Sequence, residues 1–166
     1  MSSSYSDSPA ISMEGVRRSF GTKPILQGIT AVLQPGKVVG LLGRNGEGKS
    51  TLFHILLDML AADSGNIEVL GHRPDGSGTI RQLVGYIPER PAFHEFMTAG
   101  EAFALRRRFF KNWSMDKAFA LSKRLDLDWQ TKIQGASKGT LGKIAWVCAA
   151  AHDPKLFLLD EPTSGL

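Results

Sequence analysis

Apolar residues follow two different periods in the first third of the chain. Residues 11–42 are typical of strands, and the apolar runs at 29–33 and 38–42 flank a Pro-Gly turn pair. The run 38–42 contains no polar side chain, so we expect a central strand that is buried on both faces. From about Lys49 to residue 60 the apolar positions recur every three or four residues, which predicts an amphipathic helix.

The second half of the chain combines short strands with a helical stretch. Thr98 and Glu101 form a capping-box pattern at the start of a helix that runs toward Phe110. The apolar run 156–159 is typical of a buried parallel strand. The other expected elements are strands at 66–70 and 83–87 and helices that begin near Ser114 and Lys138. The pattern therefore predicts an α/β core that is interrupted by a helical insert.

Length and composition are those of one globular domain. The chain has 166 residues, of which 42% are hydrophobic and 22% charged, and this mix argues against a disordered chain. The formal net charge of +4 does not by itself indicate a nucleic-acid-binding protein. Cys148 is the single cysteine, which excludes an internal disulfide and a cysteine-rich zinc site.

The sequence shows no signal for targeting or membrane insertion. The longest apolar run, 144–151, is far shorter than the roughly 20 residues of a membrane-spanning helix. Residues 1–10 are Ser-rich without a basic region or an apolar core, so we expect a disordered lead and not a signal peptide. The arginines at 106–108 either contact a membrane partner or acidic lipid, or form a solvated helix face.

A glycine-rich loop carries the chemistry of the first half. Residues 43–50, Gly-Arg-Asn-Gly-Glu-Gly-Lys-Ser, fit G-x-x-x-x-G-K-[ST] between an expected strand and an expected helix. Glycines let backbone N–H groups converge on phosphate oxygens, and the helix N-terminus adds its positive dipole end. We expect Lys49 to pair with the β- and γ-phosphates of a bound nucleotide and Ser50 to offer its hydroxyl to Mg²⁺.

Two carboxylates, Asp160 and Glu161, follow the expected strand 156–159. Ligand chemistry in parallel sheets gathers at the carboxyl ends of the strands. We expect Asp160 to hold Mg²⁺, directly or through water, and Glu161 to orient and polarise the attacking water as a general base. The alternative is a polar strand end with two solvated acids, and the phosphate loop upstream favours the functional interpretation.

With these motifs, the chain resembles the nucleotide-binding domain of the ATP-binding cassette (ABC) family. The resemblance rests on the loop 43–51, the run 158–166 (Leu-Leu-Asp-Glu-Pro-Thr-Ser-Gly-Leu), a signature-like segment at 136–140 and a Q-loop-like segment at 83–89. It covers the chain from residue 11 onward. It implies a P-loop NTPase fold with a RecA-like core, an antiparallel β part and a helical subdomain inserted at about 91–144.

The resemblance also implies roles for single residues. Phe20 would stack on adenine, with a core or turn aromatic as the alternative. Glu89 stands where the family more often has the Q-loop glutamine, and it would bind Mg²⁺ or water unless it is a solvated loop acid. Ser137 and Gly139 match the signature positions that close over the γ-phosphate held by a second subunit, and an N-cap role of Ser137 is compatible with this.

The implied site is therefore distributed over the whole chain. The residues implied to contact the nucleotide are Phe20, Gly43, Asn45, Gly46, Gly48, Lys49, Ser50 and Thr51. Those implied to hold Mg²⁺ are Ser50, Asp160 and Glu89, and those implied to carry catalysis are Lys49 and Glu161. Glu47 departs from the family pattern, which usually has a small residue there, and we expect its charge to face solvent.

By this resemblance the chain is an ATP-binding and ATP-hydrolysing subunit of a membrane transporter. ATP and Mg²⁺ are the implied cofactors. The implied partners are a transmembrane permease and a second nucleotide-binding domain, as a homo- or heterodimer, without nucleic acid, in the cytoplasm on the inner face of the membrane. The segment from Phe109 to Trp113 further resembles exporter subunits of the bacitracin- or antibiotic-efflux type.

Two other functions stay open on the sequence alone. One is a soluble cassette ATPase in translation or DNA repair, and the other is a non-catalytic nucleotide-binding fragment. The family pattern continues past Leu166 with a D-loop Asp, further strands and a switch histidine. We therefore expect a domain that is truncated at its C-terminal end and impaired in turnover.

Overall fold

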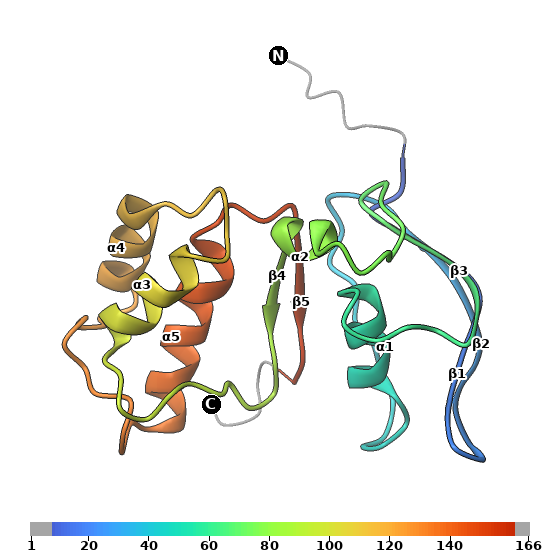
Figure 1. Ribbon diagram of the computed structural model, residues 1–166, viewed down its shortest axis with the longest axis horizontal. Helices are drawn as coiled ribbons and strands as arrows, with labels where there is room; N and C mark the ends of the chain where they lie inside the picture. Colours follow the sequence, from blue (N-terminus) through green and yellow to red (C-terminus); the bar gives the residue numbers. More distant parts are fainter. Residues whose placement is uncertain (1–7, 162–166) are drawn as a thin grey trace. The chain divides into compact units, whose positions relative to one another are not determined.

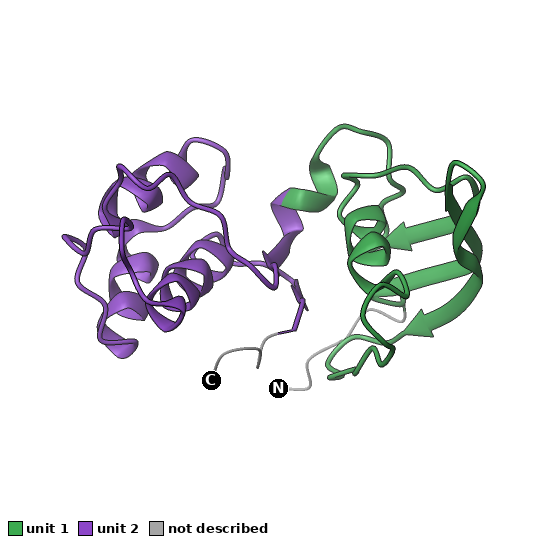
Figure 2. Cartoon of the chain, turned by 90° about the horizontal axis from the view of Figure 1, so that it is seen from below, with its two compact units in different colours: residues 1–81 green, residues 82–166 purple. Residues whose placement is uncertain are grey.

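The computed structural model describes residues 8–161 in two compact units, of which one ends at Arg81 and the other begins at Gln82 (Figure 2). Residues 1–7 of the expected lead and residues 162–166 of the expected Asp-Glu-Pro-Thr-Ser-Gly-Leu run lie outside the described residues. Each unit has its own sheet and its own buried residues.

A three-stranded antiparallel sheet in the order β2-β1-β3 forms the frame of the first unit (Figure 1). Its strands are β1 (Ile11–Phe20), β2 (Lys23–Leu33) and β3 (Ser64–Val69). Ile11, Met13 and Val16 of β1 are buried, which gives the sheet one apolar face. Just before β1, the Ala10 N–H donates to the Leu33 carbonyl at 2.8 Å.

The predicted helix after the glycine-rich loop is confirmed as α1 (Lys49–Leu56), although it is shorter than expected. Its buried residues are Leu52, Ile55 and Leu56, which repeat at three or four positions, and the helix contacts β3. The helix ends before Asp58, whose φ of 56° lies in the left-handed region.

The predicted central strand at 38–42 is wrong. These residues are irregular, and Val38 and Leu42 are 104% and 94% exposed. A strand exists only where a neighbouring strand accepts and donates its backbone hydrogen bonds, and 38–42 joins neither of the sheets in the described part of the chain. The apolar run indicates strand propensity, but it does not specify a neighbouring strand with which it could pair.

The second unit contains a parallel pair of strands, β4 (Val84–Ile87) and β5 (Leu156–Leu159), in register from Val84↔Leu156 to Ile87↔Leu159. Both strands were expected, and the parallel direction is confirmed. The short helix α2 (Thr79–Leu83) leads into β4. Parallel strands require a long crossover, and here the crossover contains the helical residues between them.

The crossover contains three helices, α3 (Ala99–Arg107), α4 (Met115–Arg124) and α5 (Lys138–Ala150), as predicted (Figure 1). All three begin at a side-chain N-cap: Thr98 with the full capping box to Glu101, then Ser114 and Ser137. Phe103, Ile144 and Val147 are fully buried in the core that these helices share. Within residues 8–161, none of the helices has the length and apolar character needed to cross a membrane.

Candidate functional site

The glycine-rich loop joins the irregular segment 38–42 to α1. Gly48 is the N-cap of α1, with φ 97° and no side-chain cap. A Cβ at this position would lie 2.7 Å from Ile25 Cγ2 and 3.0 Å from Leu26 Cδ2. Only glycine therefore fits where the loop passes β2, and the left-handed conformation excludes other residues for a second reason. Gly46, with φ 84°, supplies the other sharp turn of the loop.

Lys49 points its ammonium group back along the loop. Its Nζ donates to the Gly43 carbonyl at 2.8 Å and to the Arg44 carbonyl at 3.1 Å. The first turn of α1 contains no acidic residue, and no side chain caps it. The helix N-terminus and the lysine thus place positive charge at one end of the loop, which is the arrangement that binds phosphate groups. Asn45 is exposed, and Ser50 and Thr51 lie in α1.

Glu47 behaves differently from the prediction. Its side chain is exposed, as expected, but the carboxylate turns back onto the loop and accepts the Arg44 N–H at 2.7 Å. It does not simply face solvent. A carboxylate three residues after a backbone N–H can accept that N–H and close a turn. This local rule is the signal in the sequence that points to the contact.

Asp160 directly follows β5 and is 5% exposed. Its N–H donates to the Ile87 carbonyl at 2.9 Å, so the parallel ladder continues one residue past β5. Tyr86 on the neighbouring strand has its pKa raised to about 12, mainly by burial and further by the negative charge of Asp160. A carboxylate at the carboxyl end of a strand is suited to hold a cation, because carboxylate oxygens are ligands of Mg²⁺.

Glu161 is exposed and has φ 51°, in the left-handed region. Its backbone therefore turns away from the line of β5 at the residue that follows the buried Asp160. Non-glycine residues in this region concentrate at functional sites, because the surrounding structure must hold them there. The two adjacent carboxylates thus occupy different environments, one buried and one open to water.

Glu89 follows β4, is exposed, and lies 3.8 Å from the Arg90 guanidinium. The expected Mg²⁺ residues divide between the units, with Ser50 in the first and Glu89 and Asp160 in the second. Within the described residues, no group of three or more His, Cys, Asp or Glu side chains is placed to hold a metal ion. Hydroxyl and carboxylate oxygens fit Mg²⁺ in chemistry, since this ion keeps several waters and shares its other positions with phosphates.

Ser137 and Gly139 lie in the exposed first turn of α5. The Ser137 hydroxyl accepts the Thr140 N–H at 3.1 Å and is 2.9 Å from the Thr140 hydroxyl, which confirms the N-cap role. A Cβ at Gly139 would meet only Ser137 Oγ, at 3.8 Å. The space over this helix end is therefore open to a ligand from outside, and the signature role stays a prediction.

Phe20 closes β1 next to Gly21, whose φ is 58°. The ring is 49% exposed, and the Arg18 guanidinium lies 5.0 Å from its centroid. A core position is therefore excluded, while a turn aromatic remains an alternative, because a turn begins at Gly21. An exposed aromatic face with a cation on it is compatible with base stacking, which stays a prediction.

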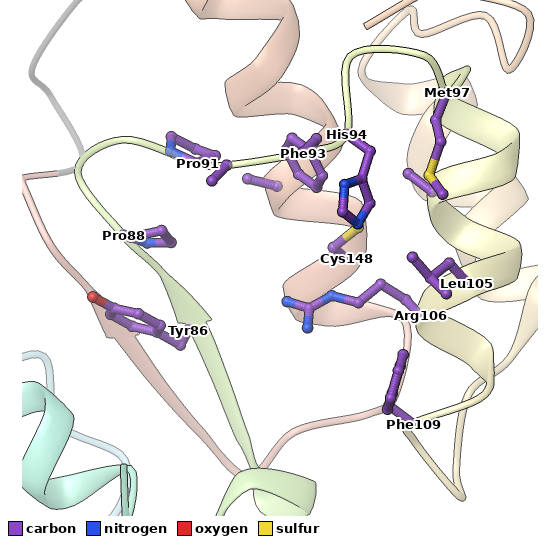
Figure 3. Close-up of a pocket in the computed structure, with 13 residues that line it drawn as sticks. Tyr86, Pro88, Pro91, Phe93, His94, Met97, Leu105, Arg106, Phe109 and Cys148 are labelled. Carbon is purple, nitrogen blue, oxygen red and sulfur yellow. The ribbon is translucent and has the colours of Figure 1, made fainter. Parts of the chain in front are cut away.

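The second unit contains a cavity of about 360 Å³ that the sequence did not reveal (Figure 3). It lies among the residues that follow β4, the helix α3 and the helix α5, and its wall is largely apolar. Arg106 lines this cavity and also lies over the Phe110 ring at 5.4 Å, whereas Arg107 and Arg108 are exposed. The three consecutive arginines therefore do not form one continuous solvated face.

His152 follows α5 and is only 2% exposed. Its Nε2 lies 3.3 Å from the Val84 carbonyl, and its ring stacks on Phe110 at 4.1 Å between centroids. Burial lowers the pKa of this imidazole, and the positive charges of Arg106 and Lys117 lower it further, against the effect of two backbone contacts. These effects together favour the neutral form of the ring in the folded protein.

This environment predicts a loss of stability in mild acid. Because the native pKa lies below the unfolded value of about 6.5, the unfolded chain binds more protons as the pH falls. The contribution of His152 is complete above about pH 6.5 and is lost as the pH falls through the native pKa. The expected slope is at most about 1.4 kcal/mol per pH unit in the free energy of unfolding, measured by urea titration between pH 5 and 8.

The control for this prediction is a pair of variants. His152→Phe keeps an aromatic ring against Phe110 and should flatten the acid slope, while His72→Gln at an exposed position should keep it. An unchanged slope in His152→Phe would assign the effect to other groups.

Comparison with known proteins identifies the family of this chain. The model of the ABC transporter family matches residues 26–164. The uncharacterized ABC transporter ATP-binding protein YdbJ of Bacillus subtilis is 32% identical over 161 residues, which cover 95% of this chain and 52% of the relative. The Nod factor export ATP-binding protein I of Rhizobium sp. is 33% identical over 164 residues, which cover 95% of this chain and 54% of the relative.

The fold is also similar to that of a solved structure. The solved structure of the ATP-binding subunit of an ABC transporter superimposes with a TM-score of 0.82 at 28% identity, over 92% of this chain and 66% of that subunit. The chain spans about half the length of the curated relatives described above. The mixed α/β fold is the ABC nucleotide-binding fold that the motifs predicted, and the chain belongs to the ABC transporter family.

Proposed function

We propose that this chain is the ATP-binding core of a subunit that hydrolyses ATP to drive export through a separate transmembrane permease. The geometry of the phosphate loop carries the proposal: Gly48 pressed against β2, Lys49 folded along the loop and an uncapped helix N-terminus. Several relatives are named Nod factor export ATP-binding protein I, and this name supports the export direction.

In this proposal the loop binds and orients the triphosphate. The N–H groups of Gly46 and Gly48 and the N-terminus of α1 face the phosphate oxygens, with Asn45, Gly43 and Thr51 completing the cradle. Lys49 neutralises charge on the β- and γ-phosphates. Phe20 stacks on the adenine. These residues perform binding and positioning, which supply most of the catalysis in phosphoryl transfer.

The second unit supplies the acidic groups. Asp160, which is buried, and Glu89 are proposed as Mg²⁺ ligands of this unit, as Ser50 is of the first. When bound, Mg²⁺ neutralises charge between the β- and γ-phosphates. Glu161 lies in the open and is proposed to orient the attacking water and accept its proton.

Ser137 and Gly139 are proposed to act on another molecule. Their N–H groups and the Ser137 hydroxyl stand at an exposed helix N-terminus, which suits the γ-phosphate held by a second nucleotide-binding domain. ATP would then join the two domains, and hydrolysis would release them. The helical part at about 91–144 would transmit this change to the permease, and the subunit would sit on the cytoplasmic face of the membrane.

The direct test is nucleotide binding by Lys49→Ala, followed with a fluorescent ATP analogue and Mg²⁺. Charge-assisted hydrogen bonds contribute about 1.5–3 kcal/mol, so the dissociation constant should rise by roughly 10- to 150-fold. Lys37→Ala, at an exposed position of the same unit, is the matched control and should bind like the wild type. Equal binding by both variants would contradict the proposal.

A further inference from the structure

Glu47 places a carboxylate inside the phosphate loop. Its Oε2 accepts the Arg44 N–H at 2.7 Å, while its own N–H donates to the Arg44 carbonyl at 3.2 Å. Arg44 and Glu47 are thus joined by two hydrogen bonds, and Gly46 with its positive φ lies in the turn between them. The side chain fastens the loop on itself.

The absence of a side chain at Gly43 makes room for this carboxylate. A Cβ on Gly43 would lie 3.1 Å from Glu47 Oε2 and 3.9 Å from Lys49 Cδ. The carboxylate and the lysine stem therefore flank the same residue, and the Lys49 ammonium donates to the Gly43 carbonyl. The exposed Glu47 side chain thus folds its negative charge onto the loop that also contains Lys49.

An anion in this position is in conflict with the task of the loop. The loop presents backbone N–H groups and a lysine to phosphate oxygens, and these donors attract any anion, including one from the same chain. A triphosphate that enters meets a like charge at short range, and like charges repel, with a strength in this exposed loop that depends on the salt concentration. The loop has one state in which Glu47 is bound to it and one in which Glu47 is displaced. The triphosphate favours the displaced state only by its higher affinity for that state.

We propose that Glu47 is a built-in competitor of the nucleotide phosphates, which the triphosphate must displace from the loop and which lowers the affinity of this chain for ATP. The inference rests on the proposed function and adds a residue that sets nucleotide affinity. It predicts that the effect depends on the negative charge of Glu47, that it concerns phosphate groups and not the adenosine part, and that salt weakens it.

The test compares the wild type with Glu47→Gln and Glu47→Ala in isothermal titration with MgATP, inorganic pyrophosphate and adenosine. Glu47→Gln keeps the size of the side chain and removes the charge. Both variants should bind MgATP and pyrophosphate about tenfold more tightly at low salt, with a smaller gain at high salt, and adenosine should show no change. Glu14→Gln removes an exposed carboxylate from β1 of the same unit and should behave like the wild type.

The contact itself has an independent measurement. The Arg44 amide should show slow hydrogen exchange and a downfield proton shift in the nucleotide-free wild type, and both should be lost in Glu47→Ala.

The outcomes separate the two proposals. If the wild type binds MgATP and Glu47→Gln and Glu47→Ala bind it equally or more weakly, Glu47 is not a competitor and the nucleotide-binding function stands. If neither the wild type nor any variant binds MgATP or pyrophosphate, the proposed function fails as well. Binding by Glu47→Gln alone would support the competition in its strongest form.

Discussion

Glu161→Gln should leave ATP binding intact and lower the rate of ATP hydrolysis by about 10²- to 10⁴-fold, the usual contribution of a positioned general base. Glutamine has the shape of glutamate and can still hydrogen-bond a water, but it cannot accept the proton. Binding should persist because Glu161 lies after β5, whereas the phosphate loop precedes α1.

The measurement is steady-state phosphate release together with the dissociation constant for MgATP. Glu95→Gln is the matched control, since Glu95 is an exposed glutamate of the same unit that the proposed mechanism does not use. An unchanged rate in Glu161→Gln would remove Glu161 from the mechanism. A parallel loss in both variants would show that the effect is not specific to this position.

Of the glycine-to-alanine substitutions in the second unit, Gly85→Ala should lower the free energy of unfolding most. A Cβ at Gly85 would lie 2.5 Å from the Ala149 carbonyl oxygen and 2.8 Å from two carbon atoms of the Phe157 ring. The first of these atoms belongs to the backbone of α5, so it cannot move without displacing the helix from β4. Overpacking of this kind costs about 1–3 kcal/mol or more in the free energy of unfolding.

The same chain offers a glycine of opposite character. Gly142 lies within α5, and a Cβ there would have no heavy atom within 4 Å. Alanine is about 0.5–1 kcal/mol better than glycine in a helix, so Gly142→Ala should stabilise the protein. Urea denaturation of both variants, followed by the fluorescence of the tryptophans, measures the two shifts. Destabilisation by both, or by neither, would contradict the packing argument.

The elements that follow local rules were predictable from the sequence. The capping box at Thr98 and the N-caps at Ser114 and Ser137 each involve residues within three positions of one another, so no distant contact is needed to specify them. The glycine-rich loop before α1 is local as well. The nature of the expected chemistry, phosphate binding, followed from these short motifs.

Features that depend on distant partners were not predictable in the same way. Residues 38–42 have strand composition but no strand, because pairing requires a neighbour that the run itself does not specify. Tyr86 lies near Asp160 because β4 and β5 pair in one particular register across the whole helical crossover. The cavity beside α3 and α5 likewise results from packing among segments that are far apart in the sequence.

The phosphate loop around Glu47 combines features set by the local sequence with features set by the tertiary structure. The sequence by itself determined that a carboxylate stands in a phosphate loop, and that the loop begins a helix whose N-terminus attracts anions. The contact of this carboxylate with the Arg44 N–H, three residues away, is also local, whereas only the tertiary structure decided that the loop packs at Gly48 against Ile25 and Leu26 of β2. Short-range chemistry is encoded in adjacent residues. The pairing of strands and the packing of the loop against β2 arise only when the folded chain brings separate segments together.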